Sequence, residues 1–184
     1  MRHRRLPRLD LAGHTYYLTC CTHNRRPFLR AGRAAQMLID LYAGYRDRGD
    51  IRLHGYVIMP DHYHVLVTLA AEPSVSGLVR KIHGVFAWRW HAWAGDEAPA
   101  LRNGWGEAGD EAPALRGRAR CRIWQRRFYD HVVRDDEDWR TKLTYMHGNP
   151  VRAGLADLAI EYLWSSAAFW ETGTGPVACD GIRW

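Results

Sequence analysis

Lysine is almost missing from this sequence, although the chain is basic. Lys81 and Lys142 are the only lysines among 26 lysine and arginine residues, which face 20 acidic ones and leave a net charge of +6 and a pI near 9.4. The planar guanidinium of arginine suits phosphate better than a point charge does, so this bias favours a nucleic-acid partner. A high-GC genome that encodes arginine in place of lysine would give the same bias, so composition alone does not decide whether the partner is a nucleic acid.

Paired cysteines and long apolar runs are also scarce. Cys20, Cys21, Cys121 and Cys179 show no Cys-x-x-Cys spacing, which argues against a zinc site or a disulfide framework. No long apolar segment follows the basic start of the chain, so we expect no signal peptide, no membrane span and a cytoplasmic location. A hydrophobic content of 47% in 184 residues is enough for one core, so we predict a single domain over residues 1–184.

Hydrophobic periodicity predicts alternating strands and helices. Runs of β-forming residues predict strands over residues 15–22, 51–58, 62–69 and 123–133. Apolar residues at three- and four-residue steps predict helices over residues 33–48, 75–93 and 136–148. The order strand, helix, strand, strand, helix indicates an α+β fold of the ferredoxin-like type, with an antiparallel sheet and helices packed on one face.

An internal repeat interrupts this pattern. The sequence AGDEAPALR occurs at residues 94–102 and again at residues 108–116. Two polar copies rich in Gly, Pro and acidic residues are too few for a solenoid, so we predict a flexible duplicated loop over about 94–121. Residues 171–184 are expected to form a C-terminal tail without a readable role.

Two histidines stand one residue apart in the strand predicted over residues 62–69. Successive side chains of a strand point to opposite faces, so His62 and His64 share one face while Tyr63 and Val65 share the other. Two neutral imidazoles on neighbouring same-face positions can chelate one divalent ion. A His-x-His pair alone is weak, because two unrelated histidines on a half-buried strand give the same pattern.

The last predicted helix carries a second group of polar residues. Trp139, Leu143 and Met146 form its apolar stripe, while Tyr145 and Asn149 fall on a separate polar strip. Two imidazoles and an amide oxygen can hold a metal ion, and a phenol one turn from that amide can attack a metal-polarised phosphate.

A rival nucleophile and the general base stay open at this point. Tyr129 is the rival, because His131 lies on the same strand face and could serve as its base. Lys142, on the strip of Tyr145, is a further candidate for the base. Tyr145 is the nucleophile we favour.

Three motifs in this order give the chain a family resemblance. They are residues 55–66 (GYVIMPDHYHVL), 124–131 (WQRRFYDH) and 145–155 (YMHGNPVRAGL). Together they resemble the single-tyrosine HUH transposases, above all the REP-associated tyrosine transposases, over most of the chain. The sequence departs from these relatives at Asp61, where Asn is common, and at Tyr63 between the histidines.

The resemblance implies a role for each matching residue. His62 and His64 are the paired metal ligands, Asn149 is the third ligand and Tyr145 is the nucleophile. Such enzymes use a divalent metal, Mg²⁺ or Mn²⁺, to cleave single-stranded DNA beside an imperfect hairpin. They form a 5′-phosphotyrosine link, free a 3′ hydroxyl and rejoin strands in DNA transposition without ATP.

The expected partner is single-stranded or hairpin DNA, bound by a monomer or a homodimer, with no membrane partner. Three arginine pairs could contact phosphate: Arg4 and Arg5, Arg25 and Arg26, and Arg126 and Arg127. One alternative is a hairpin-binding protein that has lost catalysis. Another is a phosphohydrolase of small nucleotides, which Leu66 disfavours because such a His-x-His-x-His motif requires histidine there.

Overall fold

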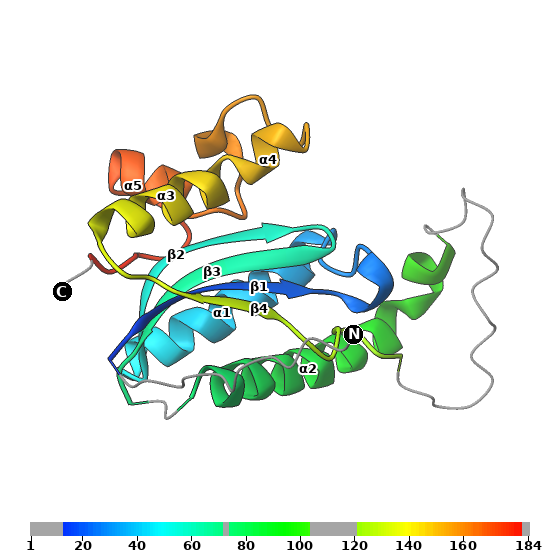
Figure 1. Ribbon diagram of the computed structural model, residues 1–184. Helices are drawn as coiled ribbons and strands as arrows, with labels where there is room; N and C mark the ends of the chain where they lie inside the picture. The colour runs from blue at the N-terminus through cyan, green and yellow to red at the C-terminus, as the bar shows by residue number, and fades with distance from the viewer. Residues whose placement is uncertain (1–12, 72–73, 104–120, 182–184) are drawn as a thin grey trace, which may run out of the picture.

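A computed structural model describes residues 13–71, 74–103 and 121–181 (Figure 1). The strands are β1 (Thr15–Cys21), β2 (Ile51–Met59), β3 (His62–Leu69) and β4 (Tyr129–Val132). The helices are α1 (Gly32–Asp47), α2 (Val75–Asn103), α3 (Asp136–His147), α4 (Asn149–Arg152) and α5 (Ala167–Thr172), with short 3₁₀ helices η1 (His23–Arg25) and η2 (Ala159–Glu161). Apart from the shorter β4 and the longer α2, the predicted elements lie close to these bounds.

The four strands form one antiparallel sheet in the order β2-β3-β1-β4. β3 lies inside the sheet, where Val65 pairs with Leu18 of β1 on one side and with Tyr56 of β2 on the other. This strand order, reached through β1, α1, β2, β3, α2 and β4, is the ferredoxin-like arrangement. The predicted α+β fold class with an antiparallel sheet is confirmed.

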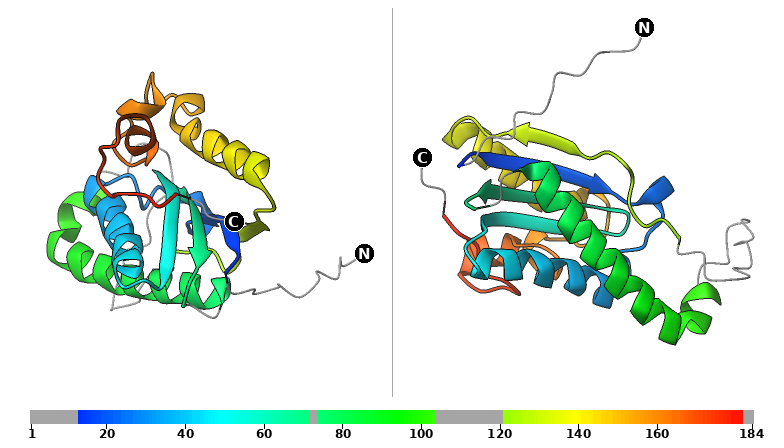
Figure 2. Two further views of the ribbon diagram at one scale, coloured as in Figure 1. Left: turned by 90° about the vertical axis from the view of Figure 1, so that its left-hand side faces the viewer. Right: turned by 90° about the horizontal axis from the view of Figure 1, so that it is seen from below.

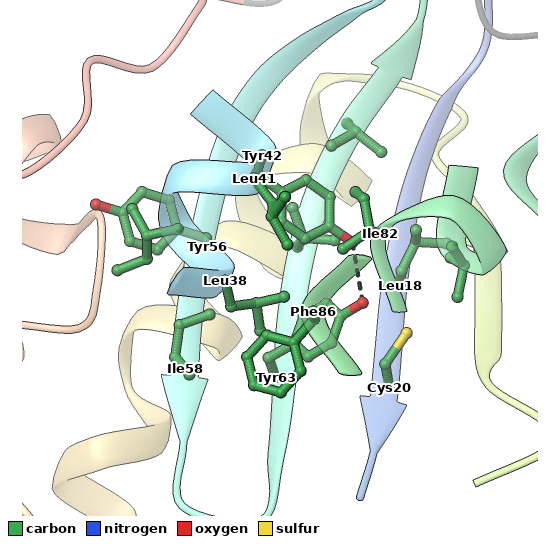
Figure 3. Packing of buried hydrophobic residues seen from close by; sticks show 14 of the residues in the cluster. Leu18, Cys20, Leu38, Leu41, Tyr42, Tyr56, Ile58, Tyr63, Ile82 and Phe86 are labelled. Carbon is green, nitrogen blue, oxygen red and sulfur yellow. Dashed lines mark hydrogen bonds between the residues drawn. The ribbon is translucent and has the colours of Figure 1, made fainter. Parts of the chain in front are cut away.

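Helices α1 and α2 cover one face of the sheet. Tyr63 and its same-face neighbours on β3 pack there against Leu38 and Tyr42 of α1 and Phe86 of α2 (Figure 3). The hydroxyls of Tyr42 and Tyr63 lie 3.0 Å apart and form a buried hydrogen bond. Tyr63 therefore faces the main core, and the adjacent His62 and His64 are directed to the opposite face, as the period-two pattern predicts.

The opposite face carries a second layer that the prediction of helices on one face omitted. Figures 1 and 2 show α3 on the side of the sheet away from α1 and α2. Its predicted apolar stripe, formed by Trp139, Leu143 and Met146, packs against Val57 and Leu66 of the sheet. The second layer has a physical cause: β2 and β3 also carry apolar side chains on this face, namely Val57, Met59 and Leu66, and these must be covered.

Gly55 allows α3 to approach β2 closely. A β-carbon at this position would lie 2.7 Å from both Leu143 Cδ1 and Met146 Cε, well inside van der Waals contact. Ser166, which precedes α5, also accepts a hydrogen bond from the Tyr56 backbone N–H at 2.9 Å. The close packing of Leu143 and Met146 on Gly55 holds α3, and with it Tyr145, against β2.

Helix α2 continues past its predicted end. It runs from Val75 to Asn103, so residues 94–103 of the predicted flexible loop are helical. Alanine, leucine and arginine in the first repeat copy are good helix formers; the remainder of the predicted loop, residues 104–120, lies outside the described residues. No described helix, α2 included, is long and apolar enough to cross a lipid bilayer.

The C-terminal segment is docked, whereas the sequence predicted only a tail without a role. Its Asp180 carboxylate accepts hydrogen bonds from Arg46 Nε and Nη2 at 3.0 and 2.9 Å and from the Leu53 backbone N–H at 2.9 Å. The Asp180 backbone N–H and carbonyl pair with the Leu53 carbonyl and His54 Nδ1. Because β2 is an edge strand, this segment covers backbone groups that would otherwise face solvent.

Two histidines away from the paired His62 and His64 make stability depend on pH. Burial lowers the pKa of His83, stacked on Trp124, to about 3, and that of His147, hydrogen-bonded to Ser166, to about 4. Below pH 6.5 the unfolded chain binds protons that the folded chain does not, so stability is full above that pH and falls as the pH drops toward 4.

We expect His147→Gln to weaken this pH dependence. The amide can still hydrogen-bond Ser166 but does not titrate, so between pH 7 and pH 5 the variant should lose about 2 kcal/mol less unfolding free energy than the wild type. Urea denaturation at both pH values measures the difference. Equal losses in the two proteins would contradict the neutral state assigned to His147.

Candidate active site

The two histidines of β3 come together on the sheet face that carries α3. The ring centroids of His62 and His64 lie 5.0 Å apart, with the ring planes at 85°. Because β3 is hydrogen-bonded on both sides, its backbone holds this separation. The structure therefore brings the two predicted metal ligands into one pair.

His64 is held from β1. Its Nδ1 lies 2.8 Å from the Tyr17 hydroxyl and 2.8 Å from Thr19 Oγ1. In the tautomer that carries its proton on Nδ1, the ring donates to these oxygens and leaves the lone pair of Nε2 for a metal. Burial, helped by the charges of His62, Arg25 and Arg152, lowers the His64 pKa to about 3, so the ring is in the neutral, metal-binding form at physiological pH.

His62 is held by the residue before it. Its Nδ1 donates to the Asp61 carboxylate at 2.6 Å, and the same carboxylate lies 3.4 Å from Arg25 Nη1. A carboxylate behind a metal-binding imidazole fixes its tautomer and the orientation of its ring. Asp61 stands where the resembling family commonly has Asn, and its carboxylate can orient His62 in this way.

Tyr145 projects from α3 toward this pair. Its side chain is 51% exposed, and its ring centroid lies 6.1 Å from that of His64. Asp135 caps the helix that carries it: the Asp135 carboxylate accepts a hydrogen bond from the Asp138 backbone N–H at 2.8 Å. An accessible phenol thus faces the histidines from a capped helix fixed on the sheet.

Asn149 begins α4, one turn after Tyr145. Its Oδ1 accepts a hydrogen bond from Arg152 Nη2 at 3.0 Å, and its Nδ2 is buried without a hydrogen-bond partner in the described part of the chain. Buried amide nitrogens without partners are rare, so this side chain is incompletely satisfied by the described part of the protein alone.

The donor set of His62, His64 and Asn149 fits a divalent cation. Imidazole suits several first-row metals and an amide oxygen suits harder ions such as Mg²⁺ and Mn²⁺. Within residues 13–71, 74–103 and 121–181, no group of three or more His, Cys, Asp or Glu side chains is placed to hold a metal. A third protein ligand at the histidine pair would therefore have to be of another type, such as the amide of Asn149.

Tyr129, the rival nucleophile, lies on the same sheet face but farther from the histidines. Thr19 pairs with His64 on one side and with Tyr129 on the other, so two strand spacings, roughly 10 Å, separate Tyr129 from His64. His131, its candidate base, is hydrogen-bonded at 2.7 Å to Asp138 of α3. Lys142 lies 3.9 Å from the other oxygen of Asp138.

Two of the predicted arginine pairs lie at one end of the sheet. The backbone N–H of His23 bonds the Ile123 carbonyl at 2.7 Å, and that of Gln125 bonds the Cys21 carbonyl at 3.0 Å. The segment with Arg25 and Arg26 therefore runs beside the segment with Arg126 and Arg127, and all four side chains are exposed. Arg4 and Arg5 lie outside the described residues.

Sequence reasoning missed the β1 hydroxyls that hold His64. Tyr17 and Thr19 alternate onto the face of the histidines, but only the pairing of β1 with β3 places them beside His64. Burial raises the pKa of the Tyr17 phenol, so this hydroxyl stays protonated. A sequence signal exists in the period-two pattern of β1, although the register that gives it meaning is a tertiary property.

Comparison with known proteins identifies transposases as relatives of this chain. The family model described as "Transposase IS200 like" matches residues 11–107, more than half of the chain. A REP-associated tyrosine transposase of Escherichia coli K12 is 26% identical over 148 residues, which cover 80% of this chain and 72% of that protein. A provisionally named REP-associated tyrosine transposase of Haemophilus influenzae is 43% identical over 44 residues, only 25% of its length.

A solved structure shares the fold. It is a REP-associated tyrosine transposase bound to a REP hairpin, with a TM-score of 0.64 and 23% identity over 97% of this chain and 92% of that one. At this identity the likeness shows the fold alone. The predicted relationship to tyrosine transposases is confirmed by the family match and the curated relatives, and with it the prediction of an enzyme: the chain belongs to the IS200-like transposase family.

Proposed function

We propose that this protein cleaves and rejoins single-stranded DNA beside hairpins in DNA transposition, with Tyr145 as nucleophile and a divalent metal held by His62, His64 and Asn149. The observation that carries the proposal is the approach of the exposed Tyr145 ring to within 6.1 Å, centroid to centroid, of His64. A nucleophile beside a pair of histidines is the arrangement that metal-assisted phosphoryl transfer needs.

The bonds exchanged are those of a phosphodiester. Tyr145 Oη bonds to the phosphorus and loses its proton, while the bond from phosphorus to the 3′ oxygen breaks and that oxygen gains a proton. The products are a 5′-phosphotyrosine and a free 3′ hydroxyl. Because the phosphodiester energy is kept in the new bond, a second 3′ hydroxyl can attack it and restore Tyr145 without ATP.

The metal would supply Lewis-acid polarisation of the scissile phosphate, with Mg²⁺ or Mn²⁺ as the proposed ion. Residues of the chain itself orient the two histidines. Asp61 orients His62, and the hydroxyls of Tyr17 and Thr19 orient His64. Burial keeps His64 neutral, so no proton has to leave this ring before it binds an ion.

The DNA would reach the site along the end of the sheet where Arg25, Arg26, Arg126 and Arg127 are exposed. Arg25 is also 3.4 Å from Asp61, beside His62, so a strand that follows these arginines arrives at the histidine pair. Phosphate contacts of this kind set position and salt dependence rather than sequence. The REP-associated tyrosine transposase of the same fold that was solved bound to a REP hairpin supports a hairpin as the DNA partner.

The test is covalent capture. Labelled single-stranded oligonucleotides that carry hairpins from the flanks of the gene are incubated with the protein and Mg²⁺ or Mn²⁺, and a denaturing gel separates adducts from free DNA. We expect a metal-dependent adduct and a shortened strand with a 3′ hydroxyl. Tight hairpin binding without adduct or cleavage under any metal would favour the catalytically silent binder instead.

A further inference from the structure

Arg152 spans the joint between α3 and α4. Its Nη2 donates to the backbone carbonyl of Tyr145 and, at 3.0 Å, to Oδ1 of Asn149. Its Cζ also lies 4.5 Å from the centroid of the Tyr145 ring, a cation–π contact. One guanidinium therefore touches both the candidate nucleophile and the candidate third ligand.

Gly148 makes room for this contact. A β-carbon at position 148 would lie 2.6 Å from Arg152 Nη1, so any side chain there would displace the guanidinium. The backbone itself does not need glycine, because φ is −77° and ψ is −8°, in the ordinary right-handed region. The missing side chain at this position thus serves the approach of Arg152.

The joint needs such a link. The helix changes from α3 to α4 between His147 and Asn149, and Pro150 has no N–H to continue the backbone hydrogen bonds of α3. Tyr145 lies before this joint and Asn149 after it. Strand cleavage would require both to address one phosphate, and a misplacement of 1 Å can cost about 10²-fold in rate.

We propose that Arg152 is a positioning residue for strand cleavage: its guanidinium ties Tyr145 to Asn149 across the joint, so that the phenol and the third ligand are held in one arrangement. The proposal rests on the proposed function. It assigns Arg152 a geometric role, distinct from attraction of the DNA backbone by its charge.

Gly148→Ala separates these roles, because the variant keeps Arg152 and its charge while displacing the guanidinium. Alanine is the better helix former at this φ and ψ, so the melting temperature should equal or exceed that of the wild type. We expect the single-turnover rate of adduct formation at saturating DNA to fall about 10- to 100-fold. The affinity for the hairpin oligonucleotide, measured without metal, should change less than about twofold.

Arg152→Gln and the double variant complete a cycle. If Gly148→Ala acts through Arg152, the double variant should be no slower than Arg152→Gln alone, whereas independent effects would multiply. Arg152→Lys keeps the charge but lacks the planar fork, so its rate should stay low. Arg89→Gln, an exposed charge removal on α2 across the sheet, should leave the single-turnover rate unchanged and is the matched control.

A readout without catalysis uses the protein free of DNA and metal. In protein labelled with 3-fluorotyrosine, the ¹⁹F resonance of Tyr145 is the one lost in Tyr145→Phe. We expect it to shift in both Gly148→Ala and Arg152→Gln, because the cation leaves the ring face. Three results would each overturn the inference: an unmoved resonance, a wild-type rate in Gly148→Ala, or multiplicative losses in the double variant. Absence of an adduct in the wild type would instead overturn the proposed function itself.

Discussion

Replacing Tyr145 by phenylalanine should abolish the covalent adduct and lower strand cleavage by about 10³-fold or more, the scale of loss seen when a nucleophile is removed from an enzyme. The change removes one hydroxyl from a half-exposed side chain, so the fold and the apolar contacts of the ring remain. Denaturing gels with labelled hairpin oligonucleotides measure both the adduct and the shortened strand.

Tyr129→Phe is the matched control. It removes the same hydroxyl from the other exposed tyrosine on this face of the sheet. Because Tyr129 stands two strands from His64 and its candidate base His131 is engaged with Asp138, the adduct should persist in this variant. An adduct that survives in Tyr145→Phe and disappears in Tyr129→Phe would reverse the assignment of the nucleophile.

The sequence predicts those parts of the candidate site that depend only on the periodicity of a single strand or helix. The period of two in a strand places His62 and His64 on one face and Tyr63 in the core, and the buried cluster around Tyr63 agrees. The helical period likewise separates Tyr145 from the stripe of Leu143 and Met146, which is buried against the sheet. These inferences need only the geometry of single elements.

Other parts of the site depend on which elements meet. The hydroxyls of Tyr17 and Thr19 reach His64 only through the register of β1 against β3. The position of α3 over the second face requires that both faces of the sheet be covered, and the docking of Asp180 depends on a salt bridge to Arg46 from a helix far away in the chain. No pattern within one segment specifies such pairings.

Arg152 illustrates the limit inside a motif. The sequence places it in the same short segment as Tyr145 and Asn149, yet the helical period alone does not say that its guanidinium folds back over the Tyr145 ring. That conformation requires the space left by Gly148. The motif therefore predicts that Arg152 lies near Tyr145 and Asn149. Only the conformation of its side chain shows that it contacts both of them.

His64→Ala should remove metal binding and, with it, strand cleavage. The imidazole is 5% exposed, and no other described side chain is placed to supply the missing nitrogen, because Tyr17 and Thr19 offer only hydroxyls there. Loss of one of two imidazole ligands should weaken Mn²⁺ affinity at least about 100-fold, beyond the 10- to 100-fold typical of losing a residue that orients a ligand. Isothermal titration of Mn²⁺ into the Tyr145→Phe background measures this without turnover.

Two further variants make that measurement specific to the site. Tyr17→Phe removes a hydroxyl that orients His64 but leaves the ring in place, so its Mn²⁺ affinity should fall by an intermediate factor, about 10-fold. His131→Gln removes a histidine of the same sheet face whose ring is engaged with Asp138, and its affinity should match that of the background. We expect the Mn²⁺ affinity to be lowest in His64→Ala, intermediate in Tyr17→Phe and unchanged in His131→Gln. This order follows only if His64 binds the ion through Nε2 while hydroxyls of β1 hold Nδ1. Equal affinities in His64→Ala and His131→Gln would mean that the ion binds elsewhere, and the metal site would then have to be assigned to other residues.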